Sequence, residues 1–322
     1  MPESSKNSPA PVIVGGTIAI DHVKTPGSEG TDLLGGSAAY AALSATFFAS
    51  DVRLIGIVGH DFPAAHLSML ESRGVNLGGV ERSEGASFTW SGEYMENMNE
   101  RVTHQVGLNV LESWEVKVPT ELADAPIVVL ANMSPDNQMQ MLAGCGAENR
   151  FVIADTMDLW IEIANERLHE VLRQLDLFVI NESEAREFAG TSNLIEAGRL
   201  LLGKGPKFVV IKLGEFGAML FSAAGGTTTV PCPDSFFRCA AFPLRGIADP
   251  TGAGDSFLGG LAGYLAAHAG GDYSFKNIRK AVVYGSVLAS FTCEAFSTQR
   301  LEGISTSDVE ARLEAFRAMT AW

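Results

Sequence analysis

Two aspartates, Asp249 and Asp255, flank a run of small residues that could bring backbone amides close to an anion. Residues 251–254 read TGAG and lead directly into an apolar stretch that favours a helix. Glycines tolerate unusual dihedral angles and carry no side chain to block a ligand. Successive amides before a helix can form an anion-binding nest, which the helix dipole strengthens. A carboxylate at Asp255 also suits the first turn of a helix as a plain cap. A chemical role and a capping role of Asp255 therefore both stay open.

A second polar pair, Asn181 and Glu184, follows an apolar run in the segment NESEA. Residues three apart share a face if the segment starts a helix, so the pair could act on one ligand. The alternative is a capping box, in which Asn181 caps the helix and Glu184 is the capping acid.

Two other glycine patterns do not fit the phosphate-binding loops they resemble. Residues 198–205, GRLLLGKG, match the first seven positions of a P-loop, but Gly205 replaces the Ser or Thr that would hold Mg²⁺. The letters RLLL favour a helix, with Gly203 as its C-cap. Residues 252–257 lack the third glycine of a dinucleotide fingerprint, because Phe257 occupies that position. A dehydrogenase is therefore disfavoured.

The chain resembles the ribokinase/PfkB family of sugar and nucleoside kinases in five segments, which occur in family order and span nearly its whole length. DPTGAGDSF resembles the C-terminal signature of the family, and LLGGSAAYAA resembles its N-terminal signature. GIVGHDFPAAHLSMLESRGVN resembles the segment that usually follows. NESEA resembles the NxxE motif, and KLGEFGAML resembles the nucleotide-binding strand and turn. The resemblance implies a kinase that uses ATP with Mg²⁺ and phosphorylates a hydroxymethyl group.

The resemblance assigns the chemical step to the glycine-rich stretch. Asp255 is implied as the catalytic base, which touches the substrate and takes the proton from its hydroxyl group. The amides of Gly252, Ala253 and Gly254, with that of Asp255, are implied to stabilise the charge that develops on the transferred phosphoryl group.

The resemblance also assigns the nucleotide site. Its ATP-binding residues are implied to be Asn181, Lys212, Gly214, Gly217 and Gly254. Glu184 is implied to organise Mg²⁺ through water, because Mg²⁺ keeps much of its hydration shell. The alternative for the glycines at 214 and 217 is an ordinary hairpin turn.

Two positions of the glycine-rich signature match a cation site of the family. Asp249 and Thr251 are implied to help bind a monovalent cation, which makes K⁺ a candidate cofactor. The alternative for Asp249 is a side chain that caps the turn.

The acceptor site is implied to include Asp21, Gly35 and Gly36, which align with family positions that bind sugar hydroxyls. Arg101 could contact a charged or hydroxylated substrate, and a solvated arginine is the alternative. Tyr40 stands where the family often has a sugar-binding asparagine. Tyrosine cannot reproduce the paired donor and acceptor of an amide. This departure favours an acceptor with an aromatic or apolar part, such as a nucleoside.

The elements that must position these residues alternate between short apolar runs and helical patterns. The apolar runs lack polar alternation, as do strands buried on both faces; they are PVIVGG, VRLIGIVG, PIVVLA, FVIAD, LFVIN and KFVVIKLG. Helices are expected at residues 37–48, 63–73, 136–147, 161–174, 194–202, 255–268, 275–291 and 306–319. This order predicts an α/β fold, with a doubly wound, mostly parallel sheet and helices on both faces. Ligands bind beyond the carboxyl ends of the strands in such sheets.

Two polar segments, residues 17–34 and 86–110, interrupt this alternation and indicate antiparallel strands that are wet on one face. We expect them to form one small β lid, and long surface loops are the alternative. Residues 1–322 are therefore expected to form a single ribokinase-like domain that carries this lid. The exposed lid could pair with a second copy of the chain in a homodimer.

The composition limits the partners of the chain. Its 322 residues carry a net charge of −15, and 46% of them are hydrophobic, which suits a large core. Nucleic acid is a poor partner, because its phosphates need a basic surface. No apolar run is long enough to span a membrane, and the polar start MPESSKNSPAP lacks a hydrophobic signal region. The cysteines at 145, 232, 239 and 293 lack metal-binding spacing and indicate reduced thiols, so the cytoplasm is the expected compartment.

The sequence leaves three functions open. The leading one is a sugar kinase that phosphorylates a hydroxymethyl group of a small carbohydrate. The alternatives are a nucleoside kinase of the same family and a binding or regulatory protein without turnover. The intact Asp255, Gly252 and Gly254 favour a kinase. The expected ligands are ATP and a small sugar or nucleoside.

Overall fold

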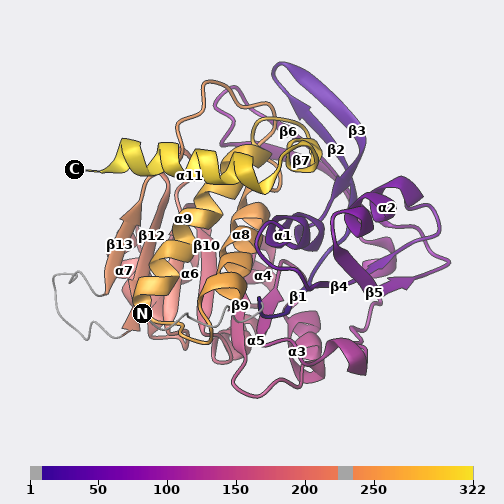
Figure 1. Cartoon of the computed structure of the whole chain (residues 1–322). Helices are drawn as coiled ribbons and strands as arrows, with labels where there is room; N and C mark the ends of the chain where they lie inside the picture. Colours follow the sequence, from indigo (N-terminus) through magenta and orange to yellow (C-terminus); the bar gives the residue numbers. More distant parts are fainter. Residues whose placement is uncertain (1–8, 224–234, 322) are drawn as a thin grey trace.

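The computed structural model describes residues 9–223 and 235–321, which contain one large sheet (Figure 1). Across the sheet the strands are β13 (Phe236–Cys239), β12 (Ala218–Ser222), β11 (Phe208–Lys212), β10 (Leu177–Asn181), β9 (Phe151–Ala154), β8 (Ile127–Leu130), β1 (Val12–Gly15), β4 (Val52–Val58) and β5 (Val75–Arg82). Neighbouring strands are parallel from β11 to β5. The pairs β11–β12 and β12–β13 are antiparallel.

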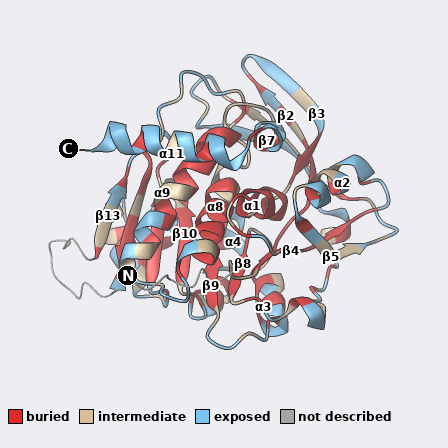
Figure 2. Cartoon of the chain, viewed as in Figure 1, coloured by how far each residue is buried: buried red, intermediate tan, exposed pale blue. Residues whose placement is uncertain are grey.

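The strands that the apolar runs predicted lie side by side in the parallel part of the sheet. Strands β1, β4, β8 and β9 are buried along their whole length, because helices cover both of their faces (Figure 2). Strands β5 and β13, which the sequence analysis did not predict, lie at the two edges. Their side chains are mostly exposed or half-buried, so the apolar signal there is weak.

Helices cover both faces of the sheet, so the predicted doubly wound α/β fold is confirmed. One face carries α1 (Ser37–Ala45), α2 (Ala64–Ser72), α8 (Ala253–His268), α9 (Phe275–Thr292), α10 (Gln299–Gly303) and α11 (Thr306–Thr320). The other carries α3 (Pro135–Gly144), α4 (Asp158–Ile163), α5 (Asn165–Leu172), α6 (Glu182–Ala189) and α7 (Leu194–Leu202). The letters RLLL, residues 199–202, lie at the end of α7, and Gly203 is its C-cap, so the predicted helix over these letters is confirmed.

The prediction of one helix over residues 161–174 is wrong. The chain forms α4 and α5 there, with a break at Ala164, where φ is −133° and ψ is 30°. The side chain of Asn165 donates a hydrogen bond to the carbonyl of Ile161 at 3.0 Å. That carbonyl would accept the backbone amide of Asn165 in a continuous helix, so the side chain competes with the backbone and ends α4.

Strands from both polar segments form a second, smaller sheet, which we call the small sheet (Figure 1). Its strands in order are β3 (Ser28–Gly35), β2 (Ala19–Thr25), β6 (Phe88–Tyr94) and β7 (Arg101–Gly107). The expectation of antiparallel pairing is wrong for β2 and β6, which are parallel. Strand β2 follows β1, and β6 follows β5. Because β1 and β5 run in the same direction, the chain leaves the large sheet in the same direction after each of them. Strands β2 and β6 therefore run parallel to each other.

Helix α8 packs unusually close to α1, and this contact fixes where α8 begins. A Cβ atom added at Gly259 would lie 2.0 Å from the carbonyl oxygen of Ala41. One added at Gly263 would lie 2.7 Å from the carbonyl oxygen of Ala45. The glycines therefore let the two backbones touch, which holds the amino end of α8 in one position relative to the large sheet.

Candidate active site

Polar side chains gather at the carboxyl ends of the central parallel strands. Asp155 follows β9, Asn181 ends β10 and Lys212 ends β11. The amino end of α8 lies at the same edge, since a Cβ atom added at Gly254 would lie 2.8 Å from Nζ of Lys212. Asp255 is in the first turn of α8. The residues meet at the edge where ligands bind in this class of sheet.

The turn before α8 is held in an unusual conformation. Gly252 caps the helix with a φ of 76°, which favours glycine. A Cβ atom there would lie 2.3 Å from the ring of Tyr40, so the turn rests on that ring. The amide of Ala253 donates to the carbonyl of Pro250 at 3.2 Å, whereas the amides of Gly252 and Gly254 donate to no group in the described part of the chain. These two amides are available to an anion at the start of α8.

Asp255 lies among both positive and negative groups. Burial raises the pKa of its carboxyl group, and the charges of Lys212 and Arg101 lower it. The negative charge of Asp255 in turn raises the pKa of Asp155 and of Asp21. A carboxylate whose proton affinity is raised by burial can act as a general base.

Asp155 belongs to this site, although no sequence motif pointed to it. Its side chain is only 4% exposed, and its Oδ1 atom has no hydrogen-bond partner among the described residues. Burial raises its pKa strongly, the charge of Lys212 opposes this, and the charges of Asp255 and Glu184 add to it. A buried carboxylate oxygen without a partner fits a cation or a bound ligand. The one available signal was the aspartate that closes the buried run FVIAD.

Asn181 and Glu184 form the capping box that the sequence allowed. The Oδ1 atom of Asn181 accepts from the amide of Glu184 at 2.9 Å, and the amide of Asn181 donates to Oε2 of Glu184 at 3.0 Å. Glu184 is buried, and its Oε1 atom lies outside the capping box. Among residues 9–223 and 235–321, no three His, Cys, Asp or Glu side chains converge to hold a metal ion by themselves. Mg²⁺ commonly completes its shell with phosphate and water.

Asp21 faces the same centre from β2. Its side chain is buried beside Gly35, where an added Cβ atom would lie 2.1 Å from Cγ of Asp21. Burial raises the pKa of Asp21 to about 8, and the charges of Asp249 and Asp255 add to this. Gly36 has a φ of 90° and lies against the backbone that follows β1. The two glycines therefore make room for the carboxylate and for its strand.

Tyr40 lies behind the glycine turn. Its side chain, with the hydroxyl group, is only 1% exposed, and its ring touches Gly252. Burial raises the pKa of that hydroxyl group, and the charges of Asp21 and Asp249 add to this. The position supports the turn, while a direct contact of Tyr40 with the acceptor stays a prediction.

Asp249 joins two loops beneath the site. It is fully buried; its Oδ1 atom accepts from the amide of Thr251 at 2.8 Å, and its Oδ2 atom accepts from the amide of Ser297 at 3.2 Å. The capping role that the sequence allowed for Asp249 is therefore present. Cation binding by Asp249 and Thr251 stays a prediction.

Gly214 and Gly217 form the turn between β11 and β12. Their φ values are 55° and 89°, and the amide of Leu213 donates to the carbonyl of Gly217 at 2.7 Å. A Cβ atom at Gly217 would lie 2.1 Å from the carbonyl oxygen of Cys239. The hairpin turn is therefore present, and contacts of its glycines with a nucleotide stay a prediction.

The small sheet contributes Arg101, the first residue of β7, which is exposed. Its guanidinium carbon lies 5.9 Å from the centre of the Trp90 ring. Its charge lowers the pKa of Asp255, whose burial has the opposite effect. Arg101 is therefore close to the site, although it comes from another sheet.

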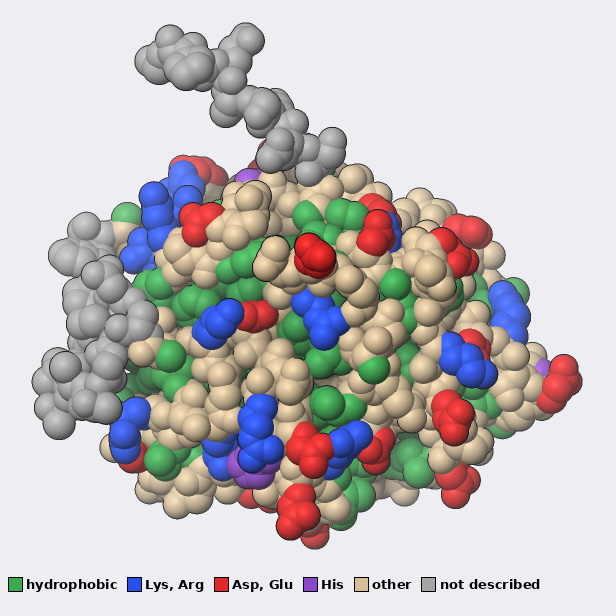
Figure 3. Space-filling view, turned by 90° about the horizontal axis from the view of Figure 1, so that it is seen from below, with side chains coloured by type: hydrophobic (Ala, Val, Ile, Leu, Met, Phe, Trp, Pro, Cys, Tyr) green, Lys and Arg blue, Asp and Glu red, His purple; other side chains and the backbone are tan. Residues whose placement is uncertain are grey.

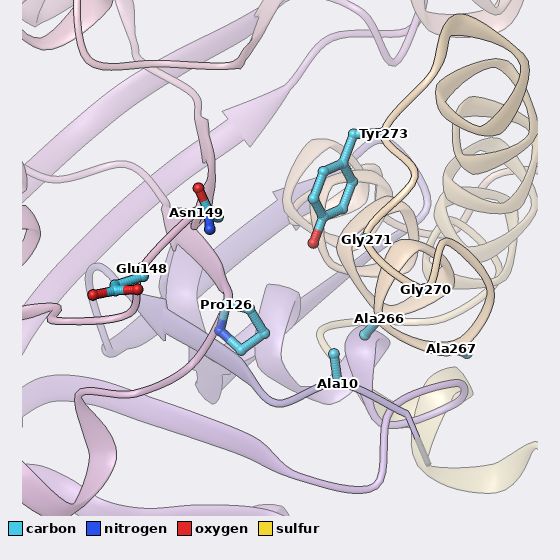
Figure 4. Close-up of a pocket in the computed structure, with 9 residues that line it drawn as sticks. All are labelled: Ala10, Pro126, Glu148, Asn149, Ala266, Ala267, Gly270, Gly271 and Tyr273. Atoms are coloured by element: carbon cyan, nitrogen blue, oxygen red, sulfur yellow. The ribbon is translucent and has the colours of Figure 1, made fainter. Parts of the chain in front are cut away.

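A separate hollow of about 380 Å³ lies at the opposite edge of the large sheet (Figure 4). Among the residues that line it, Ala10 precedes β1, Pro126 precedes β8 and Asn149 precedes β9. It therefore opens at the amino ends of the parallel strands, whereas Asp155 and Lys212 stand at the carboxyl ends. The hollow is not part of the candidate active site.

The surface and the cysteines bear on the expected partners. Basic and acidic side chains are interspersed on the face shown in Figure 3, while the absence of a nucleic-acid partner stays a prediction. In the part of the chain that is described, no helix has the length and apolar character to cross a membrane. Cys145, Cys239 and Cys293 are free thiols, and Cys232 lies outside the described residues.

Known proteins resemble this chain over most of its length. The family model described as pfkB family carbohydrate kinase matches residues 17–303. The cytidine kinase of Thermococcus kodakarensis is 29% identical over 259 residues, which cover 79% of this chain and 88% of that protein. The nucleoside kinase of Thermoplasma acidophilum is 26% identical over 309 residues, which cover 94% of this chain and 93% of that protein.

A solved structure shows the same fold. A protein from E. coli described as a putative ribokinase II, in complex with ATP and Mg²⁺, has a TM-score of 0.76 and 20% identity, and the match covers 95% of this chain and 99% of that one. The family match includes the strands and the glycine turn that carry the candidate active site. The chain therefore belongs to the pfkB family of carbohydrate kinases.

Proposed function

We propose that this phosphotransferase moves the γ-phosphoryl group of Mg²⁺-bound ATP to a hydroxymethyl group of a nucleoside. The observation that carries the proposal is the meeting of free amides, a carboxylate and an ammonium group at the amino end of α8. They belong to Gly252 and Gly254, to Asp255 and to Lys212. Two relatives that match over most of their length are a cytidine kinase and a nucleoside kinase, and this favours a nucleoside as acceptor.

The residues divide the chemical step between them. Asp255 accepts the proton of the acceptor hydroxyl group while the oxygen of that group bonds to the γ-phosphorus. The bond from this phosphorus to the leaving oxygen breaks, and ADP departs with the electron pair. The amides of the turn and Lys212 stabilise the charge on the transferred group. Asp21 accepts hydrogen bonds from other hydroxyl groups of the acceptor.

Mg²⁺ fits the donor side of the site. The unpartnered Oδ1 atom of Asp155 and the carboxyl group of Glu184 are oxygen donors of the kind that hold Mg²⁺ or its water. The bound ion would neutralise charge on the phosphates. Asn181, Lys212 and the β11–β12 turn lie at the same edge of the sheet, where they would contact the nucleotide.

A monovalent cation beside Asp249 and Thr251 is a further part of the proposal. Within the described residues, each carboxylate oxygen of Asp249 accepts one amide hydrogen bond, so lone pairs remain for K⁺. Turnover in KCl should exceed turnover in tetramethylammonium chloride at the same ionic strength. Equal rates in the two salts would remove K⁺ from the proposal.

A small carbohydrate is the second candidate acceptor. Asp21 can accept two hydrogen bonds from a diol, whether the diol belongs to a free sugar or to the ribose of a nucleoside. The buried carboxylate therefore supports both classes of acceptor.

The release of ADP from ATP, measured with a panel of nucleosides and free sugars, tests the proposal. We expect the highest kcat/KM with a nucleoside. A preference for a free sugar would replace the nucleoside by a carbohydrate. Binding of ATP without ADP release from any acceptor would contradict the kinase and indicate a binding protein. The Asp255→Asn variant, assayed in parallel, measures the rate that a contaminating kinase contributes.

We further propose that the small sheet is a lid over the acceptor and that its free edge pairs with a second copy. Strand β7 is at the edge of the small sheet, and Val102 and Val106 on it are 45% and 50% exposed. An unpaired edge strand offers its amides and carbonyls to another chain. Light scattering should show a dimer that Val106→Lys weakens. A monomeric wild-type protein would contradict this part.

A further inference from the structure

Two buried hydroxyl groups, which belong to Thr17 and Ser37, lie beside the glycines that begin α1, and we call them the hydroxyl pair. Thr17 follows β1, Ser37 is the first residue of α1, and their hydroxyl oxygens are 3.2 Å apart. The hydroxyl group of Ser37 donates to the carbonyl of Asn132, which follows β8, at 2.9 Å. The pair therefore ties together three segments that are far apart in the sequence.

The hydrogen bonds of the pair are complete. The hydroxyl oxygen of Thr17 accepts from the amide of Ser37 at 3.0 Å, and the amide of Thr17 donates to the hydroxyl oxygen of Ser37 at 3.3 Å. Because the one hydroxyl proton of Ser37 goes to Asn132, the proton between the two hydroxyl groups comes from Thr17. Both side chains are buried, so the pair acts through the groups that it holds.

The pair fixes where α1 begins. Gly36 caps this helix without a side chain, so the hydroxyl group of Thr17 takes the place of a capping group for the amide of Ser37. The amide of Ala38 donates to the carbonyl of Thr17 at 3.0 Å. A Cβ atom added at Gly36 would lie 2.4 Å from the same carbonyl oxygen, so the chain at Gly36 passes directly over Thr17.

The same contacts reach the carboxylate proposed for the acceptor. Gly35 is opposite Ala19 in the β2–β3 pair, and a Cβ atom added at Gly35 would lie 2.1 Å from Cγ of Asp21. Thr17 begins the segment that leads through β2 to Asp21, and its hydroxyl group bonds to the helix that follows Gly36. Both sides of the proposed acceptor site are therefore joined through the pair.

We infer that Thr17 and Ser37 are positioning residues for the acceptor, because their hydrogen bonds hold Asp21 and the backbone of residues 35–36 at the separation that acceptor hydroxyl groups require. This inference rests on the proposed function. Strands β8, β9 and β10 lie between β1 and β11, whose end carries Lys212. Loss of the pair should therefore weaken acceptor binding and leave nucleotide binding unchanged.

Steady-state kinetics of Thr17→Val and Ser37→Ala test the inference, with cytidine or whichever nucleoside of the panel gives the highest kcat/KM. Valine keeps the shape of threonine and removes its hydroxyl group. We expect the KM for the nucleoside to rise about 10-fold in each variant, while kcat changes less than about threefold. Thr17→Ser restores the hydroxyl group and should return the KM close to the wild-type value. Calorimetry should show the same affinity for Mg²⁺-ATP in all of these proteins.

Thr46→Val is the matched control, because it removes a hydroxyl group from the other end of the same helix. The hydroxyl group of Thr46 donates to the carbonyl of Leu43 at 2.6 Å. Thr46 is the C-cap of α1, so its loss should leave the KM for the nucleoside unchanged.

The double variant Thr17→Val/Ser37→Ala shows whether the two hydroxyl groups act as a unit. Because they share a hydrogen bond, the KM of the double variant should be close to that of Thr17→Val alone. Effects that multiply to about 100-fold would overturn the inference of one shared role.

Two further outcomes would overturn the inference. One is a wild-type KM in both single variants. The other is an equal loss of affinity for the nucleoside and for Mg²⁺-ATP, since this would indicate a general effect on the fold. A wild-type protein that binds Mg²⁺-ATP but releases no ADP with any nucleoside would overturn the proposed function instead.

Discussion

Asp255 can be a base because of the charges that surround it. Its place in the first turn of α8 suits a carboxylate, and burial raises the pKa of that carboxyl group while the charges of Lys212 and Arg101 lower it. The motif DPTGAGDSF indicated Asp255, because Asp255 and the residues of the glycine turn that act with it are adjacent in sequence. Asp155 could not be found in the same way, because it meets Lys212 and Asp255 only through the packing of separate elements.

Asp255→Asn should leave the fold intact and nearly abolish turnover. Asparagine has the same shape but cannot accept the proton of the acceptor, so kcat should fall about 1,000-fold or more. Coupled ADP release measures the rate, and calorimetry with Mg²⁺-ATP checks that the nucleotide still binds. Turnover close to that of the wild-type protein would remove Asp255 as the base.

Glu184→Gln should raise the concentration of Mg²⁺ that half-maximal activity requires. Glutamine can keep the capping bond to the amide of Asn181, so the variant removes the charge and preserves α6. The capping box of Ser305 and Asp308 at the start of α11 supplies the control, Asp308→Asn. If both variants titrate with Mg²⁺ like the wild-type protein, Glu184 serves α6 alone.

The ligand-free protein should lose stability as the pH rises from about 4 to about 8. Burial and the charges of Asp249 and Asp255 raise the pKa of Asp21 from 3.8 to about 8, so the folded state holds this proton more tightly than the unfolded chain. The favourable contribution is complete below the ordinary pKa and is lost as the carboxyl group ionises. Urea unfolding at about pH 6 and about pH 9 should show a smaller decrease for Asp21→Asn. An identical decrease in the free energy of unfolding of both proteins would show that groups other than Asp21 cause the pH dependence.

At the scale of elements, the apolar pattern of the sequence identified the strands that are buried on both faces. The six apolar runs became the central strands, because a strand covered on both faces must be apolar throughout. The sequence did not predict the edge strands β5 and β13, because their side chains are partly exposed. It also did not predict the break between α4 and α5, because the break depends on one hydrogen bond from the side chain of Asn165 and not on the apolar pattern.

Gly259→Ala should lower the free energy of unfolding by about 2 kcal/mol. The added methyl group would lie 2.0 Å from the carbonyl oxygen of Ala41, so α1 and α8 must separate. Gly303→Ala is the control, because a Cβ atom at this helical position would meet nothing within 4 Å. Urea unfolding measures both variants, and equal midpoints would contradict the close contact of the two helices.

At the scale of the whole molecule, the alternation of strands and helices was enough to predict the large sheet and the edge at which its ligands bind. It could not predict that the small sheet would touch the nucleotide turn. That contact joins Asn99 to Glu215, and no sequence motif indicates that these two residues meet. Only the folded chain brings Arg101 near Asp255.

The parallel pairing of β2 with β6 also sets an order in which the chain can fold. Strand β4, helix α2 and strand β5 lie between these two partners in the sequence. Bringing β2 and β6 together early would close a long loop, and the loss of chain entropy would exceed the favourable free energy of their contact. The small sheet should therefore assemble after β1, β4 and β5 have joined. During refolding, amides of β6 should gain protection from hydrogen exchange later than those of β4.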